Sequence, residues 1–488
     1  MFRFKRFVSM ITAASLTASL ILNTAFITPV SADEECMSAS DCVNAIGAGW
    51  NLGNTLDANG TWITADAGNY MAYETAWGNP VTTQAMIDSV RDKGFNAIRI
   101  PVTWSQHIDG NGHVNEAWMD RVKTIVDYCY NDGLYVILNV HHDTGEGGGD
   151  KVSWIFAENS TYDSVSAKYA GLWTEIANTF KDYDDHLLFE GYNEMLDSAN
   201  TWNAPRNAAS YQAVNNFAQL FVDTVRATGG RNSSRNLIVN TYVSSVDQAV
   251  LDNFTLPTDS AEGHLICEVH CYHPWGFTGT SQSVTWTSVH SNFGDSDKFE
   301  IDEVMNRLAL FSGSKGVPII IGEYGAEFKG NEDQIALYAS YLVNAAGNRG
   351  IKCFYWDNGD FKTSGEGGYA IFDRSTLNWK NSIVSAIVDA AQPYIVEAEP
   401  TPAETEATSE TSPEGSGDAT AESSAPSDAA SETSATVPDT EPQGTQPAEE
   451  PAEDTNTSSL LPLIVIDVVL VAAAAGLSLY YFKRRHQH

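Results

Sequence analysis

Short apolar runs alternate with longer amphipathic stretches between residues 42 and 394 of this 488-residue chain. Each run has four to six residues and is rich in aliphatic and aromatic side chains, which is typical of a buried β-strand. The eight runs are residues 46–51, 97–100, 135–140, 187–192, 237–240, 265–269, 318–322 and 353–356.

Helical periodicity fills the stretches between these runs. In residues 115–130, five apolar positions recur at helical spacing, and Gly133 follows as a stop signal. Residues 82–93 show a similar face made of Ala85, Met86, Ser89 and Val90. Eight strands joined by helices over about 350 residues predict an α/β fold, a (β/α)8 TIM barrel with enlarged loops after the strands. A doubly wound open sheet is the alternative, but no Gly-x-Gly-x-x-Gly follows the first strand.

Polar side chains stand at the ends of most of the predicted strands. In a barrel the carboxyl ends of all strands meet on one face, and active sites lie on that face. Two of these groups, Glu194 and Glu323, are carboxylates, and packing alone does not explain two carboxylates on the same face of the barrel. The residues concerned are Arg99, His141, His142, Asn193, Glu194, His270, Tyr272, Glu323 and Trp356.

The first 32 residues have the features of an export signal. Arg3, Lys5 and Arg6 precede an apolar run, and a small-x-small pattern ends at Ala32. We therefore expect a signal peptide over residues 1–32 and a folded domain over residues 33–396 that lies outside the cell.

Three further segments follow the predicted domain. Residues 397–457 contain sixteen acidic, no basic and no aromatic residues, which predicts a disordered, extended linker. Residues 460–482 are almost wholly apolar, and at about 1.5 Å per residue they are long enough to cross a bilayer as a transmembrane helix. The basic tail over residues 483–488 should remain in the cytoplasm, which anchors the domain on the outer face of the membrane. The alternative is a hydrophobic tail that is removed.

Charge and cysteine content narrow the possible functions. The formal net charge of −36 is shared between the linker and the predicted domain, which argues against nucleic acid as a partner. Cys36 and Cys42 are the only cysteines close together in an expected loop, so their pairing stays open. The other four cysteines fall in apolar segments and are expected to be buried thiols.

Paired carboxylates without a metal-binding motif suggest cleavage of glycosidic bonds. Glu194 would then be the general acid and base, kept partly protonated by burial or by the charge of its partner. Glu323 would be the nucleophile, held ionised by hydrogen bonds from Arg99 and Tyr272. His141 and His142 are adjacent on a strand and should point to opposite faces, so we expect no metal and no cofactor.

Seven motifs in order resemble those of glycoside hydrolase family 5, and specifically of its bacterial endo-β-1,4-glucanases. They are residues 49–57 (Gly-Trp-Asn-Leu-Gly-Asn-Thr-Leu-Asp), 98–101 (Ile-Arg-Ile-Pro), 140–143 (Val-His-His-Asp), 190–194 (Glu-Gly-Tyr-Asn-Glu), 270–272 (His-Cys-Tyr), 321–325 (Ile-Gly-Glu-Tyr-Gly) and 356–359 (Trp-Asp-Asn-Gly). Met195 stands where proline is commoner in the family, which changes the loop but removes no acting group.

The resemblance implies a retaining enzyme that cuts internal bonds of cellulose or related β-glucans, with Glu194 as acid/base and Glu323 as nucleophile. Xyloglucanase, mixed-linkage glucanase and mannanase remain alternatives with the same catalytic set. A surface glucan-binding protein without catalysis is a further alternative. We expect a monomer whose only partners are the polysaccharide and, through its anchor, the membrane.

Supporting residues are expected to bind or orient the sugar. Asn193 fits a donor to the sugar 2-hydroxyl, and Trp356 would present its flat face at the cleavage point. Asn54, in the first motif, is included among these supporting residues. Five further tryptophans in or near loops are candidates for stacking on sugars, namely Trp62, Trp77, Trp104, Trp202 and Trp275. Trp118 and Trp173 lie at helical spacing and are expected in the core.

Overall fold

The computed structural model describes residues 36–64, 69–205 and 207–396. The predicted signal peptide over residues 1–32, the linker over residues 397–457, the membrane span over residues 460–482 and the tail over residues 483–488 lie outside the described residues. Among the described helices, none combines the length and the apolar character needed to span a bilayer.

Eight parallel strands form a closed barrel in which each strand pairs with the next in the chain and β8 pairs with β1. The strands are β1 (Ala48–Leu52), β2 (Phe95–Ile100), β3 (Tyr135–Asn139), β4 (Leu187–Glu190), β5 (Leu237–Asn240), β6 (Leu265–His270), β7 (Ile319–Tyr324) and β8 (Lys352–Asp357). All eight predicted strands are therefore confirmed, with ends that differ by at most two residues. A small antiparallel ribbon of β9 (Phe372–Asp373) and β10 (Asn378–Trp379) follows β8.

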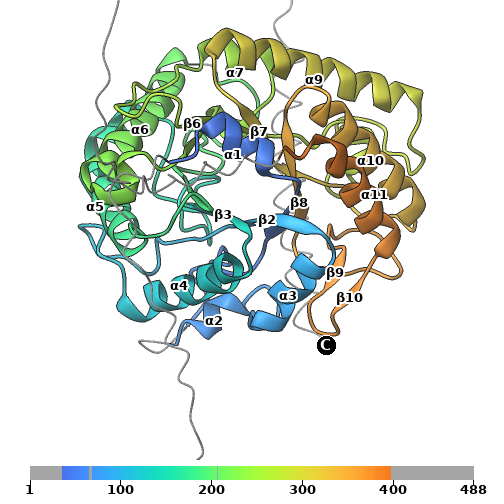
Figure 1. Cartoon of the computed structure of the whole chain (residues 1–488), viewed down its shortest axis with the longest axis horizontal. Helices are drawn as coiled ribbons and strands as arrows, with labels where there is room; N and C mark the ends of the chain where they lie inside the picture. Colours follow the sequence, from blue (N-terminus) through green and yellow to red (C-terminus); the bar gives the residue numbers. More distant parts are fainter. Residues whose placement is uncertain (1–35, 65–68, 206, 397–488) are drawn as a thin grey trace, which may run out of the picture. The chain divides into compact units, whose positions relative to one another are not determined.

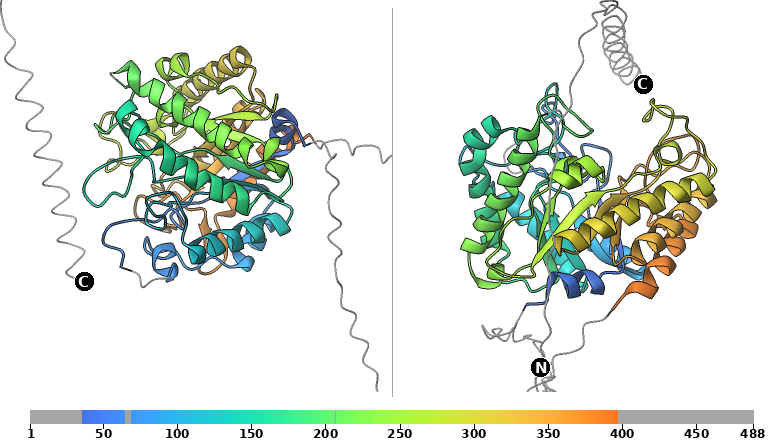
Figure 2. Two further views of the ribbon diagram at one scale, coloured as in Figure 1. Left: turned by 90° about the vertical axis from the view of Figure 1, so that its left-hand side faces the viewer. Right: turned by 90° about the horizontal axis from the view of Figure 1, so that it is seen from above.

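Helices surround the barrel, as Figure 1 shows. The α-helices are α1 (Ala39–Ala45), α2 (Met71–Glu74), α3 (Gln84–Asp92), α4 (Glu116–Asn131), α5 (Asn159–Thr179), α6 (Ala208–Ala227), α7 (Gln248–Asn253), α8 (Trp275–Thr278), α9 (Asp295–Lys315), α10 (Glu332–Gly347) and α11 (Asn381–Ala391). Three short 3-10 helices complete the set: η1 (Gly230–Ser233), η2 (Tyr242–Ser244) and η3 (Gln392–Tyr394). Among the outer helices, α5 packs beside α6 and α10 beside α11 (Figures 1 and 2).

Local sequence explains where these helices begin and which side they bury. The side chain of Asn115 caps α4 by accepting a hydrogen bond from the backbone N–H of Trp118 at 3.3 Å. The predicted apolar face of α4 is buried, Trp118 included. In α3 the buried residues are Met86, Ile87 and Val90, whereas Ala85 is exposed because the helix turns a slightly different face inward.

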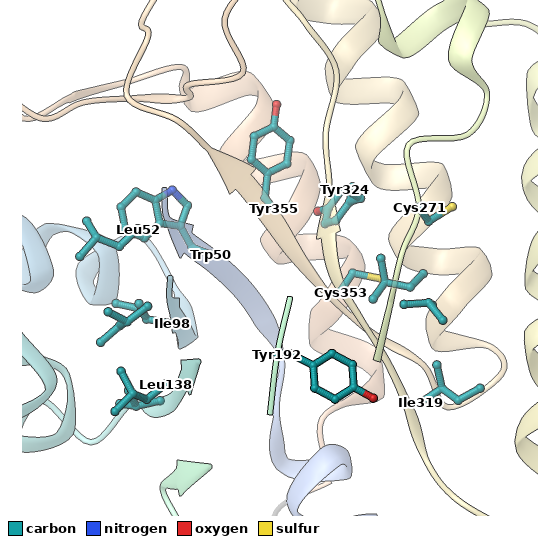
Figure 3. Packing of buried hydrophobic residues seen from close by; sticks show 14 of the residues in the cluster. Trp50, Leu52, Ile98, Leu138, Tyr192, Cys271, Ile319, Tyr324, Cys353 and Tyr355 are labelled. Carbon is teal, nitrogen blue, oxygen red and sulfur yellow. The ribbon is translucent and has the colours of Figure 1, made fainter. Parts of the chain in front are cut away.

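Two apolar clusters hold the barrel together. The larger one lies between the outer faces of the strands and the helices and includes Trp118 and Trp173 as predicted; Figure 3 shows part of it around Trp50 and Tyr324. The smaller one fills the barrel interior with one or two residues from most of the strands, among them Ile137 and Phe354, and α1 adds Cys42 to it. Helix α1 therefore closes the amino-terminal end of the barrel, which leaves only the carboxyl ends of the strands for a site.

All six cysteines are free thiols in the described residues. Cys42 lies in α1 rather than in a loop, so it is buried in the barrel interior and does not pair with Cys36. Cys129, Cys267 and Cys353 are buried thiols as expected, and so is Cys271.

Candidate active site

A layer of polar side chains lies above the apolar interior, at the carboxyl ends of the strands. Six consecutive strands each contribute one inward residue with no exposed surface, namely Asn51, Arg99, Asn139, Glu190, Asn240 and Glu268. The strand register pairs Asn51 with Arg99, Asn139 with Glu190, and Asn240 with Glu268. Since a strand alternates its faces, five of these residues follow an apolar interior residue by two positions, whereas Asn51 follows Gly49.

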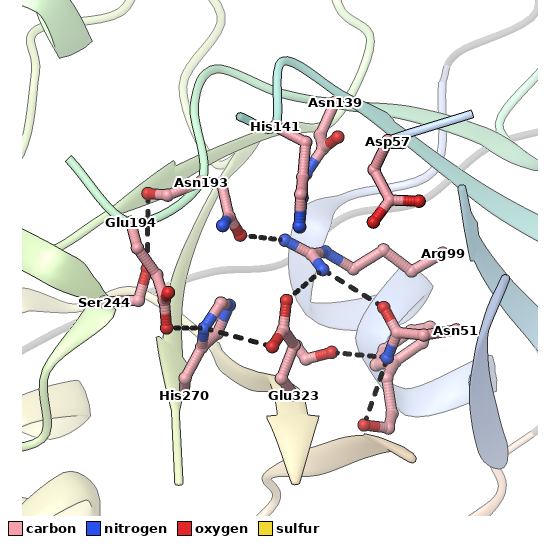
Figure 4. A network of polar contacts seen from close by, with 12 residues as sticks. Asn51, Asp57, Arg99, Asn139, His141, Asn193, Glu194, Ser244, His270 and Glu323 are labelled. Atoms are coloured by element: carbon pink, nitrogen blue, oxygen red, sulfur yellow. Dashed lines mark hydrogen bonds and ion pairs between the residues drawn. The ribbon is translucent and has the colours of Figure 1, made fainter. Parts of the chain in front are cut away.

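Arg99 stands at the centre of this layer (Figure 4). Its Nε and Nη2 donate to the two carboxylate oxygens of Glu190 at 2.6 and 2.7 Å. Its Nη1 donates to Oε1 of Glu323 at 2.8 Å and to Oδ1 of Asn51 at 3.1 Å. Nη2 also donates to Oδ1 of Asn193 at 2.8 Å. One buried guanidinium therefore fixes side chains from four different parts of the barrel.

Glu323 faces the barrel axis because β7 carries an irregularity beside it. The β6–β7 pairing passes from Ile321 directly to Glu323, so Gly322 is skipped in the register. By strict alternation Glu323 would point outward, as Ile321 does. The irregularity reverses the direction of the next side chain, so Glu323 points into the barrel. Glycine is required at position 322, since a Cβ there would lie 1.8 Å from Oε1 of Glu268.

Hydrogen bonds hold both oxygens of Glu323. Oε1 accepts from Arg99, and Oε2 accepts from the hydroxyl of Tyr272 at 2.8 Å. Burial raises the pKa of Glu323, and the charge of Glu194 adds to this shift. His270, Arg99 and the Tyr272 hydroxyl oppose the shift by favouring the ionised form.

Glu194 lies four residues beyond the end of β4 and is only partly buried. Its Oε1 contacts Nδ1 of His270 at 2.8 Å. One carboxylate oxygen of Glu194, one of Glu323 and a nitrogen of His270 lie within 4.8 Å of one another. The structure thus brings together the two carboxyls that the sequence singled out, one from the loop after β4 and one from β7, and His270 contacts both.

The carboxylates around His270 favour the charged form of its ring. Burial alone would lower the pKa of its imidazole, but Glu323, Glu194 and Glu268 surround the ring and raise it to about 10. Nε2 of the ring contacts Oε1 of Glu268 at 3.3 Å, and Nδ1 lies 3.6 Å from Oε2 of Glu323.

Trp356 and His141 form another part of the site. Their rings lie parallel, with centroids 5.8 Å apart and an angle of 5° between the planes. His141 is buried, and Nδ1 of its ring contacts the side-chain amide of Asn139 at 3.0 Å. Burial lowers the pKa of His141, which favours the neutral form of its ring. Trp356 is half-buried, which leaves part of its surface for a ligand.

A cleft of about 400 Å³ extends from Glu194 over the loops after β1, β3 and β4. Trp62 and Trp202 line it and are 56% and 48% exposed. Trp77 and His142 also line it. Exposed aromatic rings beside a carboxylate suit a sugar chain, because pyranose rings stack on flat apolar faces.

Comparisons with known proteins agree with this geometry. Residues 56–362 match the sequence model of the family Cellulase (glycosyl hydrolase family 5). The chain belongs to glycosyl hydrolase family 5. Among its relatives, Endoglucanase A of Clostridium longisporum is 41% identical over 70% of this chain and 63% of that protein. Endoglucanase A of Ruminococcus albus is 39% identical over 73% of this chain and 93% of that protein.

Solved structures of the family are similar as well. A GH5-4 broad-specificity endoglucanase from Clostridium longisporum superposes with a TM-score of 0.67 at 38% identity, over 74% of this chain and all of that one. A family 5 enzyme from Prevotella bryantii, in complex with a xyloglucan tetradecasaccharide, gives a TM-score of 0.64 at 42% identity, over 73% of this chain and 99% of that one.

The structure does not bring every predicted residue of this family 5 site into the polar network. Asn54 lies in the loop after β1, where its backbone N–H donates to Oδ2 of Asp57 at 3.1 Å and its carbonyl accepts from Asn79 at 2.8 Å. Its backbone is left-handed, with φ of 55°. Asn54 therefore shapes the loop and makes no contact with Glu194 or Glu323.

The expectation that His141 and His142 point apart is wrong. Their ring centroids lie 4.5 Å apart, because β3 ends at Asn139 and strand alternation no longer applies beyond it. Ligand atoms of Asp57, His141 and His142 lie within 4.8 Å of one another. Asp57 is already engaged by the backbone N–H groups of Asn54 and Thr55, so these atoms have a structural explanation, and we assign no metal to them.

Two of the five candidate tryptophans lie away from the cleft. Trp104 has no exposed surface, and its Nε1 donates to the carbonyl of Asn139 at 2.9 Å, so it belongs to the core. Trp275 stacks beside Tyr272 with ring centroids 5.8 Å apart.

Sequence reasoning missed Glu190 and Glu268 as site residues. Each is a charged residue inside an otherwise apolar strand, two positions after an interior isoleucine or leucine. That spacing was the available signal, since it places the carboxylate inside the barrel.

Proposed function

We propose that this chain is a retaining, endo-acting glycoside hydrolase that cleaves β-1,4-glucosidic bonds in cellulose or related β-glucans. The proposal rests on the short distance between Glu194 and Glu323, whose nearest carboxylate oxygens lie within 4.8 Å of each other. Retaining enzymes hold their two carboxyl groups about 5–5.5 Å apart, whereas inverting enzymes need about 6.5–9.5 Å to admit water.

In the first step Glu323 attacks the anomeric carbon while Glu194 gives its proton to the leaving glycosidic oxygen. The bond to the leaving sugar breaks, and a glycosyl ester forms on Glu323. In the second step Glu194 takes a proton from water, the water oxygen attacks the anomeric carbon, and Glu323 leaves as a carboxylate. Arg99 and Tyr272 stabilise that carboxylate at both of its oxygens.

Neighbouring side chains support these steps. Oδ1 of Asn193 accepts from Arg99, so its Nδ2 is the donor available to the sugar 2-hydroxyl. Trp356 offers its half-buried face to the sugar at the cleavage point. Trp62 and Trp202 extend the contact surface along the open cleft, which suits an enzyme that binds within a long chain.

Broad use of β-glucans is favoured over strict cellulose specificity. Structures similar to this chain include broad-specificity endoglucanases, one of them with bound cellotriose, a lichenase with cellotetraose and a xyloglucan-specific endo-β-1,4-glucanase. A panel of cellulose, xyloglucan, mixed-linkage glucan and mannan, with product analysis, distinguishes these substrates. Release of oligosaccharides from mannan alone would contradict a β-glucanase.

The decisive experiment replaces the nucleophile. We expect Glu323→Gln to lose activity on a soluble β-glucan by several orders of magnitude while its melting temperature shows a folded protein. Glu175→Gln changes a surface carboxylate of α5 beside His113 and should keep wild-type activity. Proton NMR of the first product should show the β-anomer. Near-normal turnover by Glu323→Gln would refute the mechanism, and binding of glucan without reducing-sugar release by the wild type would favour a non-catalytic binder.

We also propose that the enzyme is exported and held at the outer face of the membrane by residues 460–482. The support is the sequence alone, through its basic, apolar and small-residue pattern at the start and its apolar run and basic tail at the end. An antibody against the tail should detect the protein in the membrane fraction. Detection in the culture medium alone would contradict the anchor.

A further inference from the structure

Glu268 has no role in the catalytic steps proposed above, yet it contacts His270, which in turn contacts Glu194. It belongs to β6 and has no exposed surface. Its Oε1 is shared between Nε of Arg99 and Nε2 of His270, each at 3.3 Å. Its Oε2 is buried without a hydrogen-bond partner among the described residues. A buried carboxylate with an unsatisfied oxygen is costly, so its presence at this place calls for an explanation.

His270 connects this carboxylate with the acid/base. Nδ1 of the ring faces Oε1 of Glu194 at 2.8 Å, and Nε2 faces Oε1 of Glu268. Ionised carboxylates only accept hydrogen bonds, so once the proton of Glu194 has passed to the leaving sugar, both contacts are hydrogen bonds only when each ring nitrogen carries a proton. The geometry therefore selects the imidazolium form of His270.

The local charge balance requires the same form. Arg99 is the buried guanidinium for three carboxylates, Glu190, Glu268 and Glu323. Glu190 forms a bidentate pair with the guanidinium of Arg99, and Glu323 accepts a hydrogen bond from Nη1. Glu268 therefore has only a longer contact with Nε of Arg99, at 3.3 Å. A second cation is needed beside Glu268, because buried charges are stable only when paired.

The titratable groups around His270 come from several parts of the barrel. Glu194 follows β4 and Glu323 belongs to β7, and both lie close to Nδ1 of the ring. His141, beyond the end of β3, is near enough to interact with the ring electrostatically. On the β5 side the facing residue is the neutral Asn240, whose register partner is Glu268.

We infer that Glu268 is a positioning residue that holds His270 in its doubly protonated form, so that His270 stabilises the carboxylate forming on Glu194 as its proton passes to the leaving sugar. The inference rests on the proposed function of Glu194. An imidazolium at 2.8 Å favours the negative charge that appears on Glu194 in the transition state of glycosidic cleavage. The pKa of about 10 for His270 is in keeping with this role.

Two substrates separate this role from a merely structural one. Hydrolysis of a soluble β-glucan needs a proton for its poor leaving group, whereas 2,4-dinitrophenyl β-cellobioside has a leaving group that needs none. The quantity to compare is kcat/KM, which reports only the steps up to glycosyl-enzyme formation. In the full-length chain we expect Glu268→Gln to lower kcat/KM about tenfold or more for the glucan. For the dinitrophenyl substrate we expect less than about a threefold change, because acid assistance is not needed there.

Glu190→Gln is the matched control. It neutralises a second buried carboxylate on Arg99 that makes no contact with His270, so it should lower kcat/KM for both substrates by the same factor. If Glu268→Gln does not fold, Glu268→Asp keeps the charge but withdraws it from Nε2 of His270 and should show the same selective loss.

The protonation state of His270 is measured independently of catalysis. In NMR titrations of the full-length chain with labelled histidines, the signal that disappears in His270→Asn identifies the ring. It should remain protonated at pH 8 in the wild type, and its pKa should fall by about one unit or more in Glu268→Gln. An unchanged pKa, or equal losses on the two substrates, overturns the inference. Absence of glucan hydrolysis by the wild type instead refutes the proposed function, whatever the titration shows.

Discussion

Arg99 and Glu323 meet at 2.8 Å through Nη1 and Oε1, although 224 positions separate them in the chain. The same guanidinium holds Glu190 with two further hydrogen bonds. Because all three side chains are almost fully buried, their charges have no water to replace a lost partner. The contact therefore positions the proposed nucleophile and also stabilises the barrel.

Loss of the guanidinium should destabilise the fold. Arg99→Met leaves three buried carboxylates without their cation, and removal of one partner of a buried ion pair typically lowers the free energy of unfolding by about 3–5 kcal/mol. Urea denaturation measures this change. Lys298→Met is the control, since Lys298 pairs with Asp295 at the surface of α9 and should show little change. Similar unfolding curves for the two variants would contradict the assigned role of Arg99.

The hydroxyl of Tyr272 should set the acidic limb of the pH profile. Its hydrogen bond favours the ionised form of Glu323, so Tyr272→Phe raises the pKa of Glu323 further above its ordinary value. The nucleophile then stays protonated to a higher pH, and the acidic limb of kcat/KM should move to higher pH. A hydrogen bond to a charged group contributes roughly 1.5–3 kcal/mol, which predicts about a 10- to 100-fold lower kcat/KM.

Tyr324→Phe is the control for this change. Tyr324 follows Glu323 in β7, but its buried hydroxyl lacks a hydrogen-bond partner among the described residues. Its removal should leave the pH profile unchanged and should not reduce the free energy of unfolding. A shift of the acidic limb in Tyr324→Phe, or none in Tyr272→Phe, would show that the hydrogen bond has no influence on the nucleophile.

Gly322 should tolerate no side chain. A Cβ at this position would lie 1.8 Å from Oε1 of Glu268, so Gly322→Ala must displace a buried carboxylate. Overpacking of this kind lowers the free energy of unfolding by about 1–3 kcal/mol. Gly313→Ala is the matched control in α9, where a Cβ meets nothing within 4 Å and alanine should stabilise the helix by about 0.5–1 kcal/mol. Thermal or urea unfolding of both variants checks the opposite signs.

Trp202 should contribute to substrate binding more than to chemistry. It is 48% exposed in the cleft, and its Nε1 donates to Oε1 of Glu146 at 3.1 Å, which fixes its ring. Trp202→Ala should raise KM for a soluble glucan several-fold, with a smaller change in kcat and a similar melting temperature. Phe299→Ala removes an aromatic ring of α9 that is even more exposed, at 67%, and lies outside the cleft, so it should change neither constant. Equal effects of the two substitutions would exclude a specific sugar contact at Trp202.

The positions of the strands follow from the sequence because each is a short, buried apolar run. The amphipathic segments between them also follow, since a helix must present one apolar face to the barrel. The same pattern identifies Glu194 and Glu323 as a pair, because parallel strands in a barrel bring their carboxyl ends together.

Tertiary structure alone decides which way several of these side chains face. Glu323 points inward only because the register shifts beside it, and neighbouring strands set that shift. Trp104 and Trp202 both follow strands, yet one is buried and the other is exposed in the cleft. Local sequence does not distinguish them, since burial depends on loops from distant parts of the chain.

Periodicity and short motifs are local properties, so the barrel, its family and the two carboxyls at its carboxyl-terminal face can be predicted from the chain alone. The contacts of Arg99 with Glu190 and Glu323, and the place of Glu268 beneath His270, depend on how the barrel closes. These contacts join residues brought together by closure of the barrel, where burial strengthens every charge interaction and makes each unpaired charge costly.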